Sequence, residues 1–197
     1  MSEPQETLTI QQALDLAVQH HTAGRLSQAE NIYQQILQNA PNQADALHLL
    51  GVIAHQDGRN EVAVDLISKA LAVKPGYIDA YNNLGTALRG LGRLDDAVAS
   101  YQEALRLKPD LADAHNNLGS VFQDLGRLEE AVASYRKAVD LKADYPEAHC
   151  NLGLGLQLLG KLEDALVSYY RALDLKPDFA EARYNLGSAL LDMGRHK

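Results

Sequence analysis

Side-chain amides recur at a fixed interval along this chain. The stretches DAYNNLG, DAHNNLG, EAHCNLG and EARYNLG each begin 34 residues after the one before, and they place an asparagine at the same point: Asn83, Asn117, Asn151 and Asn185. An asparagine side chain offers both a hydrogen-bond donor and an acceptor, the complement of the C=O and N–H of a peptide group. Because asparagine is a poor helix former, its repetition in segments with helical spacing favours a role in binding polypeptide.

Acidic side chains form a second row, four residues before each asparagine. They are Asp79, Asp113, Glu147 and Glu181. Two further amides, Asn82 and Asn116, directly precede two of the asparagines. The carboxylates could accept hydrogen bonds from Ser, Thr, Lys or Arg side chains of a bound peptide. Structural explanations stay open for both rows, because an acid in a first helical turn is favoured by the helix dipole and an asparagine could bond a neighbouring repeat or a local carbonyl.

The same 34-residue period organises nearly the whole chain. After an N-terminal extension, 1–9, we place the repeat domain at 10–197, with five full units and a half unit: 10–43, 44–77, 78–111, 112–145, 146–179 and 180–197. Positions are counted from the first residue of each unit, so the asparagine row is position 6 and the acidic row position 2. A column with one amide per repeat could contact an extended peptide at about every third residue, since packed helices lie about 8–10 Å apart and a strand rises about 3.3 Å per residue.

Each full unit is predicted to be an antiparallel pair of helices. A glycine at position 15 suits the left-handed end of the first helix, and a proline near the end of the unit prevents the second helix from continuing. Small residues at positions 8 and 20, such as Gly119 and Ala131, would let the two helices approach closely, and Tyr135 would fill the gap toward the next pair. Since one pair cannot bury both faces, stacked pairs complete each other's core, which predicts an all-α solenoid.

Composition excludes several classes of protein. A formal net charge of -8 over 197 residues argues against binding to nucleic acid or an anionic membrane, which requires clustered Lys and Arg. The single cysteine, Cys150, cannot form an internal disulfide. The first residues do not resemble a signal peptide, and no stretch approaches 18 apolar residues. We therefore expect a cytoplasmic protein.

Residues suited to catalysis or metal binding do not form a recognisable pattern. None of the seven histidines has the i, i+4 spacing with a nearby acid that a helical zinc site requires, so we predict no metal or other cofactor. We expect His115 and His149 to pack between helices and the other histidines to be solvated. No nucleophile–base arrangement or phosphate-binding loop is present, so no catalytic residue is assigned and the chain is predicted not to be an enzyme.

The motifs resemble the tetratricopeptide repeat. The similarity rests on Leu-Gly at positions 7 and 8, A-x-x-x-Y at positions 20–24 and the closing proline, all at a 34-residue period over about residues 10–197. Departures are small: Ile67 replaces the aromatic residue, Ile36 the usual alanine and Ala143 the proline. The resemblance implies a right-handed superhelical solenoid in which the first helices line a concave groove.

The paired asparagine and acidic rows are similar to those of O-GlcNAc transferases, whose superhelix holds substrate polypeptides. The resemblance implies peptide binding by the four asparagines and four acids above, with the row ending where position 6 is Leu49 and Asp15. It also suggests the substrate-recognition arm of a larger glycosyltransferase, whose catalytic domain could follow Lys197. The alternative is a scaffold that self-associates through the unpaired helix 180–197. The groove positions lack the Lys/Arg clamp that would hold the acidic C-terminus of a heat-shock chaperone.

Overall fold

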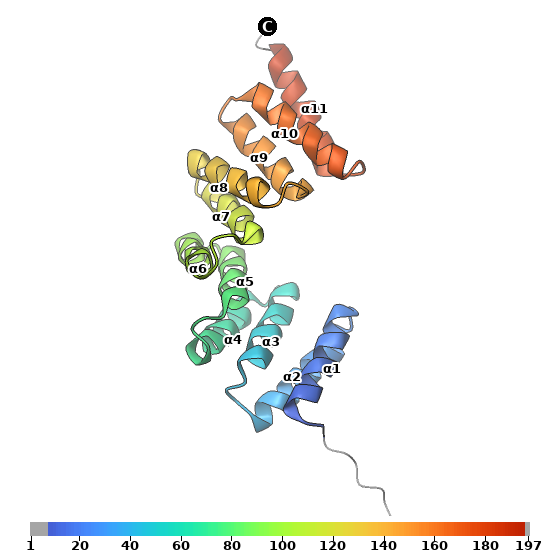
Figure 1. Cartoon of the computed structure of the whole chain (residues 1–197), viewed down its shortest axis with the longest axis vertical. Coiled ribbons are helices and arrows are strands. Elements are labelled where there is room, and N and C mark those ends of the chain that lie inside the picture. Colours follow the sequence, from blue (N-terminus) through green and yellow to red (C-terminus); the bar gives the residue numbers. More distant parts are fainter. Residues whose placement is uncertain (1–7, 196–197) are drawn as a thin grey trace, which may run out of the picture. The chain divides into compact units, whose positions relative to one another are not determined.

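The computed structural model describes residues 8–195, which form helices and loops without a strand (Figure 1). Residues 1–7 of the predicted extension lie outside the described residues. The helices are α1 (Ile10–Thr22), α2 (Leu26–Asn39), α3 (Ala44–Gln56), α4 (Asn60–Val73), α5 (Ile78–Gly90), α6 (Leu94–Leu107), α7 (Ala112–Asp124), α8 (Leu128–Leu141), α9 (Pro146–Leu158), α10 (Leu162–Leu175) and α11 (Ala180–Arg195). The all-α fold of short helical pairs predicted from the period is therefore confirmed. Odd-numbered helices are the first helices of their repeats.

A glycine with positive φ turns the chain from the first helix of a pair to the second. Gly126 has φ of 72°, its N–H donates to the Gln123 carbonyl at 2.9 Å, and Arg127 N–H donates to the Phe122 carbonyl at 2.8 Å. Equivalent glycines follow α1, α3, α5 and α9 with φ between 72° and 76°. Gly194, at the sixth predicted turn position, instead lies inside α11, because no second helix follows it within the described residues.

Substitution of Gly126 by alanine is expected to lower the free energy of unfolding by about 1–2 kcal/mol, because a Cβ disfavours the left-handed conformation. No atom lies within 4 Å of the added Cβ, so the effect isolates backbone strain. Gly76→Ala is the control, since Gly76 has equal space but no positive φ. Urea denaturation measures both variants, and equal stabilities would contradict the assignment.

In the second, fourth and fifth repeats, a buried large residue at position 24 packs against a glycine at position 8. A Cβ added to Gly119 would lie 2.7 Å from the Tyr135 ring and 3.1 Å from the Ala131 carbonyl oxygen. Tyr135 is 1% exposed, and Ile67, which takes the aromatic position in the second repeat, is fully buried against Gly51. The close approach of the two helices thus requires a glycine on one side and a large apolar side chain on the other.

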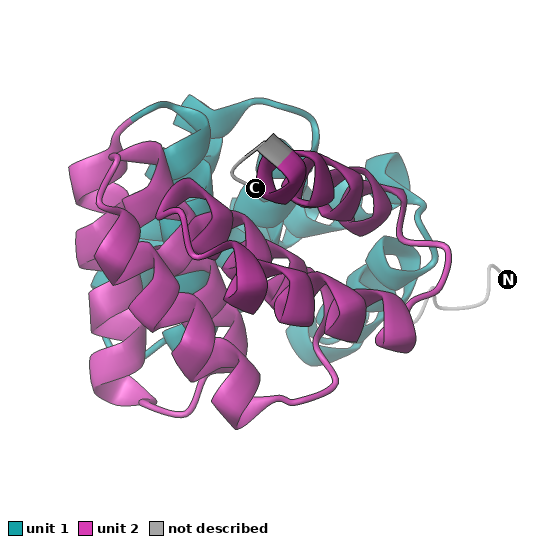
Figure 2. Ribbon diagram, turned by 90° about the horizontal axis from the view of Figure 1, so that it is seen from above, with its two compact units in different colours: residues 1–92 teal, residues 93–197 magenta. Residues whose placement is uncertain are grey.

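Contacts divide the chain into two compact units, residues 1–92 and 93–197, coloured teal and magenta in Figure 2. The boundary falls between α5 and α6, within the third repeat. Inside the first unit, α2 packs on α3 and α4 on α5; inside the second, α6 packs on α7, α8 on α9 and α10 on α11. A second helix therefore covers the first helix of the following repeat in both units.

Candidate peptide-binding face

Side chains of the asparagine row contact the preceding repeat. In the second unit, Asn151 Nδ2 donates to Asn116 Oδ1 at 3.0 Å, and Asn185 Nδ2 lies 3.8 Å from Cys150 Sγ. In the first unit, Asn83 Nδ2 lies 2.8 Å from His48 Nε2. Each pair is 35 residues apart, so position 6 of one repeat contacts position 5 of the repeat before it. The structural explanation left open above, a bond to a neighbouring repeat, therefore applies to these three asparagines.

These contacts leave hydrogen-bonding capacity at the asparagines that make them. A carboxamide has two N–H donors and a carbonyl acceptor, and the contacts described use one donor. Asn83, Asn151 and Asn185 are half-buried, so each keeps partial access to solvent. Asn116 is only 7% exposed and lies behind Asn151 as its acceptor. Asn82 and Asn117, both half-buried, have interaction partners as well.

The acidic row is exposed, and part of it is paired with lysine. Asp79, Asp113, Glu147 and Glu181 are all exposed at position 2. Lys176 Nζ lies 3.4 Å from Glu147 Oε1, and in the second repeat Lys74 Nζ lies 3.6 Å from Asp45 Oδ1. The lysine belongs to the loop that ends the same repeat. The acids of these two repeats are therefore ion-paired rather than isolated negative charges.

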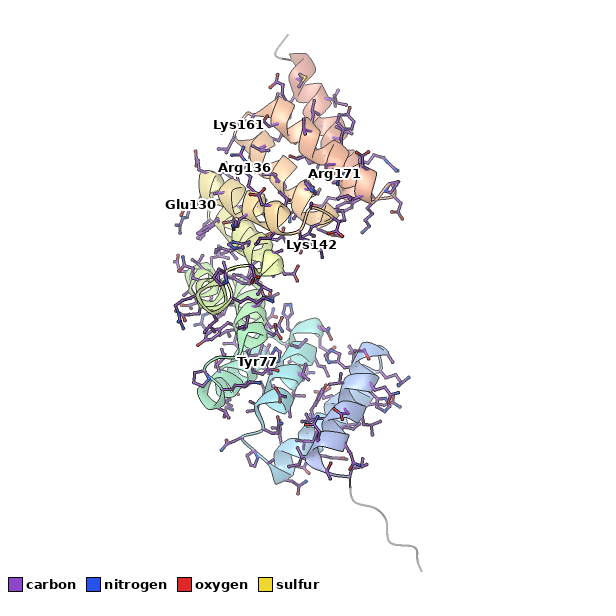
Figure 3. The ribbon with its side chains drawn as sticks, in the orientation of Figure 1. Tyr77, Glu130, Arg136, Lys142, Lys161 and Arg171 are labelled. Carbon is purple, nitrogen blue, oxygen red and sulfur yellow. The ribbon has the colours of Figure 1, made fainter. Side chains whose placement is uncertain are left out.

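In three repeats, the lysine of the loop that ends the repeat places its ammonium group over an aromatic ring. The Lys74, Lys142 and Lys176 ammonium groups lie over the rings of Tyr77, Tyr145 and Phe179, at 4.1, 4.7 and 4.8 Å from the ring centroids. Tyr77 and Lys142 are labelled in Figure 3. Such cation–π contacts hold the ammonium near the acid of position 2. Sequence analysis missed these lysines, although the spacing of Lys and an aromatic residue at positions 31 and 34 was a readable signal.

A second row of contacts joins the first helices near their C-terminal ends. Gln157 Nε2 donates to Asp192 Oδ2 at 2.8 Å, and its Oε1 accepts from the Tyr169 hydroxyl at 2.9 Å. In the first unit, His21 Nε2 lies 3.2 Å from Gln56 Oε1 with the same separation of 35 residues. Position 12 of one repeat thus contacts position 13 of the next. The first helices α9 and α11 are therefore joined at two levels, which defines the orientation of their shared face.

Comparison with known proteins agrees with this arrangement. Models of the TPR repeat match residues 85–126, 119–159 and 156–194, and a model of the tetratricopeptide repeat matches residues 14–78. The chain belongs to the tetratricopeptide repeat family. Tetratricopeptide repeats are generally non-catalytic scaffolds for protein interaction. The match does not distinguish an O-GlcNAc transferase-like array from other tetratricopeptide arrays.

Solved tetratricopeptide structures share the fold. TTC0263, a thermophilic TPR protein of Thermus thermophilus, is 29% identical with a TM-score of 0.74, covering 93% of this chain and 100% of its own. MamA is 25% identical with a TM-score of 0.73, covering 84% and 96%. YrrB, described as a TPR protein with an unusual peptide-binding site, is 23% identical with a TM-score of 0.70, covering 87% and 89%, and shows likeness of fold alone. No curated protein matches the chain.

The burial of one histidine departs from the sequence-based expectation. His48, expected to be solvated, is 3% exposed, because it occupies position 5 beneath Asn83 of the next repeat. Since an amide nitrogen can only donate, His48 Nε2 accepts from Asn83, and Nδ1–H donates to the Tyr77 hydroxyl oxygen at 2.9 Å. His48 is therefore a neutral link between two repeats.

Burial lowers the pKa of His48 to about 4, against the smaller raising effects of Asp79 and Asp45, while Lys74 adds to the lowering. Burial also raises the pKa of the Cys150 thiol to about 11, assisted by the nearby charge of Glu181. His115 and His149 are half-buried, and their Nε2 atoms lie 3.0 and 3.1 Å from the carbonyl oxygens of Pro109 and Ala143, in the loops that precede their helices. The buried ionisable side chains of position 5 are thus held in their neutral forms.

Within residues 8–195, no group of three His, Cys, Asp or Glu side chains could hold a metal ion. Over the same range, no helix is both long and apolar enough to cross a membrane. The asparagine and acidic rows are therefore the candidates for function.

Proposed function

We propose that this chain is a non-catalytic interaction module that binds extended polypeptide segments along its first helices through the asparagine row. The observation that carries the proposal is the contact of Asn83, Asn151 and Asn185 with the preceding repeat. A bond such as Asn151 to Asn116 restrains the side chain before a ligand arrives, and restraint lowers the entropy lost on binding. The remaining N–H and carbonyl of these three amides can then pair with the peptide backbone, which gives loose sequence specificity.

The acidic row would add preference for particular side chains. Glu181 and Asp113 are exposed and could accept hydrogen bonds from Ser, Thr, Lys or Arg of the bound chain. At Glu147 the paired Lys176 competes for the carboxylate, so hydroxyl groups, which carry no charge to desolvate, fit better there. This favours Ser/Thr-rich segments, in keeping with a finer proposal that the array is the substrate-recognition arm of a larger O-GlcNAc transferase-like enzyme.

The proposal predicts that replacing Asn117 and Asn151 together with alanine weakens binding more than tenfold. The probe is a labelled Ser/Thr-rich peptide of about ten residues, enough to cross three first helices at about 3.3 Å per residue. Fluorescence anisotropy measures its affinity. Asn151→Ala also deprives the buried Asn116 oxygen of its donor, so a loss of about 1 kcal/mol of stability is expected as well.

Asn116→Ala is the matched control, because it breaks the same inter-repeat bond but keeps the Asn151 amide on the face. It should match the stability loss and weaken the affinity by less than the double variant does, because the restraint on Asn151 is lost while its amide remains. If the double variant retains wild-type affinity, the asparagines serve only to join repeats and the proposed function is wrong.

A self-associating scaffold is the second candidate, favoured by the surface of α11. Tyr184, Leu190 and Leu191 are 78%, 46% and 68% exposed there. Exposed apolar side chains on one helix are typical of a protein interface. Under this proposal another copy of the chain would cover α11.

A further inference from the structure

The three asparagines that contact the preceding repeat all turn the same atom toward it. That atom is the nitrogen, and its acceptor is a side chain at position 5 of the repeat before. The distances are 2.8, 3.0 and 3.8 Å for the pairs Asn83–His48, Asn151–Asn116 and Asn185–Cys150. The acceptors are a ring nitrogen, an amide oxygen and a sulfur, so the common feature is the direction of the amide rather than the kind of residue that it meets.

The three acceptors lie below the surface that a ligand would contact. His48, Asn116 and Cys150 are 3%, 7% and 1% exposed, whereas the asparagines that donate to them are half-buried. A bound peptide would therefore meet the asparagine first. The residue at position 5 would act on the ligand only through the direction that it gives to the amide.

The repeat in which the row ends shows that positions 5 and 6 are matched. Position 6 of the second repeat is Leu49, and position 5 of the first repeat is Leu14, which is 5% exposed. Leu14 belongs to the buried core cluster on which Leu49 packs. An apolar residue therefore meets an apolar residue where the asparagine is missing, and an acceptor meets an amide donor where the asparagine is present.

The direction of the amide decides which atom is left for a ligand. In a carboxamide the nitrogen and the oxygen lie on opposite sides of Cγ, so the oxygen points away from the inner acceptor. This oxygen can only accept, and in an extended peptide the donor present at every residue except proline is the backbone N–H. An amide turned the other way would offer two N–H groups to peptide carbonyls, and the ligand would then need no N–H.

We propose that His48, Asn116 and Cys150 are positioning residues, which turn the asparagines so that each accepts a backbone N–H of the bound segment. The inference rests on the proposed function and adds the class of ligand to it. The ligands are extended segments that carry an N–H where they cross these first helices, so proline is excluded at those residues. Because sulfur is a weak acceptor, Asn185 is oriented less strongly than Asn151, and the selectivity is expected to be lower at α11 than at α9.

An ester scan of the Ser/Thr-rich peptide tests the proposal with the full chain. Replacing one backbone amide at a time by an ester removes the N–H with little change of shape. We expect a loss of affinity of about three- to tenfold, the range for one neutral hydrogen bond, at residues about three apart, and a smaller loss elsewhere. The residue at which Asn151→Ala abolishes the ester effect is the one that faces Asn151.

Substitution of the position-5 residues then separates orientation from stability. At the peptide residue that faces Asn151, Asn116→Ala should reduce the ester effect to less than about twofold, because the freed amide can turn either atom to the ligand. Asn116→Asp keeps an acceptor of the same size and should retain the effect. Cys150→Asn gives Asn185 a stronger acceptor and should increase the effect at α11. Each effect is a ratio within one variant, so a change in overall stability does not imitate it.

Nitrogen-15 NMR of the wild-type histidine rings gives a readout without a ligand. Nε2 of His48 should carry no proton at neutral pH, since it accepts from Asn83; a proton on this atom would turn the amide oxygen inward and overturn the proposal.

The peptide measurements distinguish this proposal from the proposed function. An ester scan without any sensitive residue, or an ester effect that survives Asn116→Ala, overturns the positioning role, and the proposed function stands if the Asn117 and Asn151 double variant still loses affinity. If the peptide does not bind, or binds equally well to the double variant, both proposals are wrong.

Discussion

Replacement of Tyr169 by alanine is expected to lower the free energy of unfolding by about 3–5 kcal/mol, the range for a large aromatic side chain removed from a core. Tyr169 is 0% exposed, and its ring lies 2.6 Å from the Cβ that Gly153 lacks. Its hydroxyl also donates to Gln157, which in turn contacts α11. The substitution would therefore open a cavity between the helices of the fifth repeat and remove the hydroxyl that holds Gln157 in its contact with α11.

The neighbouring tyrosine provides the control. Tyr170 is 51% exposed, so Tyr170→Ala should change stability by less than about 0.5 kcal/mol, as surface substitutions usually do. Urea denaturation followed by circular dichroism compares the two variants. Similar losses from both would mean that the tyrosine at position 24 does not carry the core of the repeat.

Acid is expected to destabilise the first unit through His48. The pKa of this side chain is about 4 in the folded chain and 6.5 in its ordinary state, so between these values the unfolded chain binds a proton that the folded chain does not. The contribution of neutral His48 is fully present above pH 6.5 and is lost as the pH falls to about 4. The difference corresponds to about 3 kcal/mol.

Urea denaturation at several pH values between 4 and 7 measures this dependence. His48→Gln should remove most of it, since glutamine does not titrate, although the variant is also expected to be less stable at pH 7 because the link from Asn83 to Tyr77 changes. A wild type and a His48→Gln variant with equal slopes would contradict the assignment.

The contacts of the asparagines alter how the row should be understood. A recurrent polar residue in a repeat can serve stacking, ligand binding or both, and the bond from Asn151 to Asn116 makes stacking one of its tasks. The cost of asparagine in a helix is compensated in part by that bond, so repetition by itself is weaker support for binding than the sequence suggested. Comparing Asn151→Ala with Asn116→Ala separates the two tasks, because only the first removes an amide from the face.

Repetition and local chemistry sufficed to predict the helical pairs. Glycines such as Gly126 mark turns by a backbone preference that needs no distant partner, and alternating small and large residues such as Gly119 and Tyr135 mark the contact within a pair. These signals act within one repeat and recur in the next, so a single chain displays them several times. The family follows from the same features, because they are what its members share.

Hydrogen-bond partners in neighbouring repeats could be identified only from the folded chain. The acceptor of Asn83 is His48, 35 residues away, and neither helical periodicity nor the 34-residue interval indicates that position 6 turns toward position 5 of the preceding repeat. His48 was expected to be solvated for the same reason: its burial comes from a neighbouring helix, whereas its own helix leaves it on the polar side. Packing between helices decides these pairings, because it depends on how two separate segments stack rather than on the preference of either one.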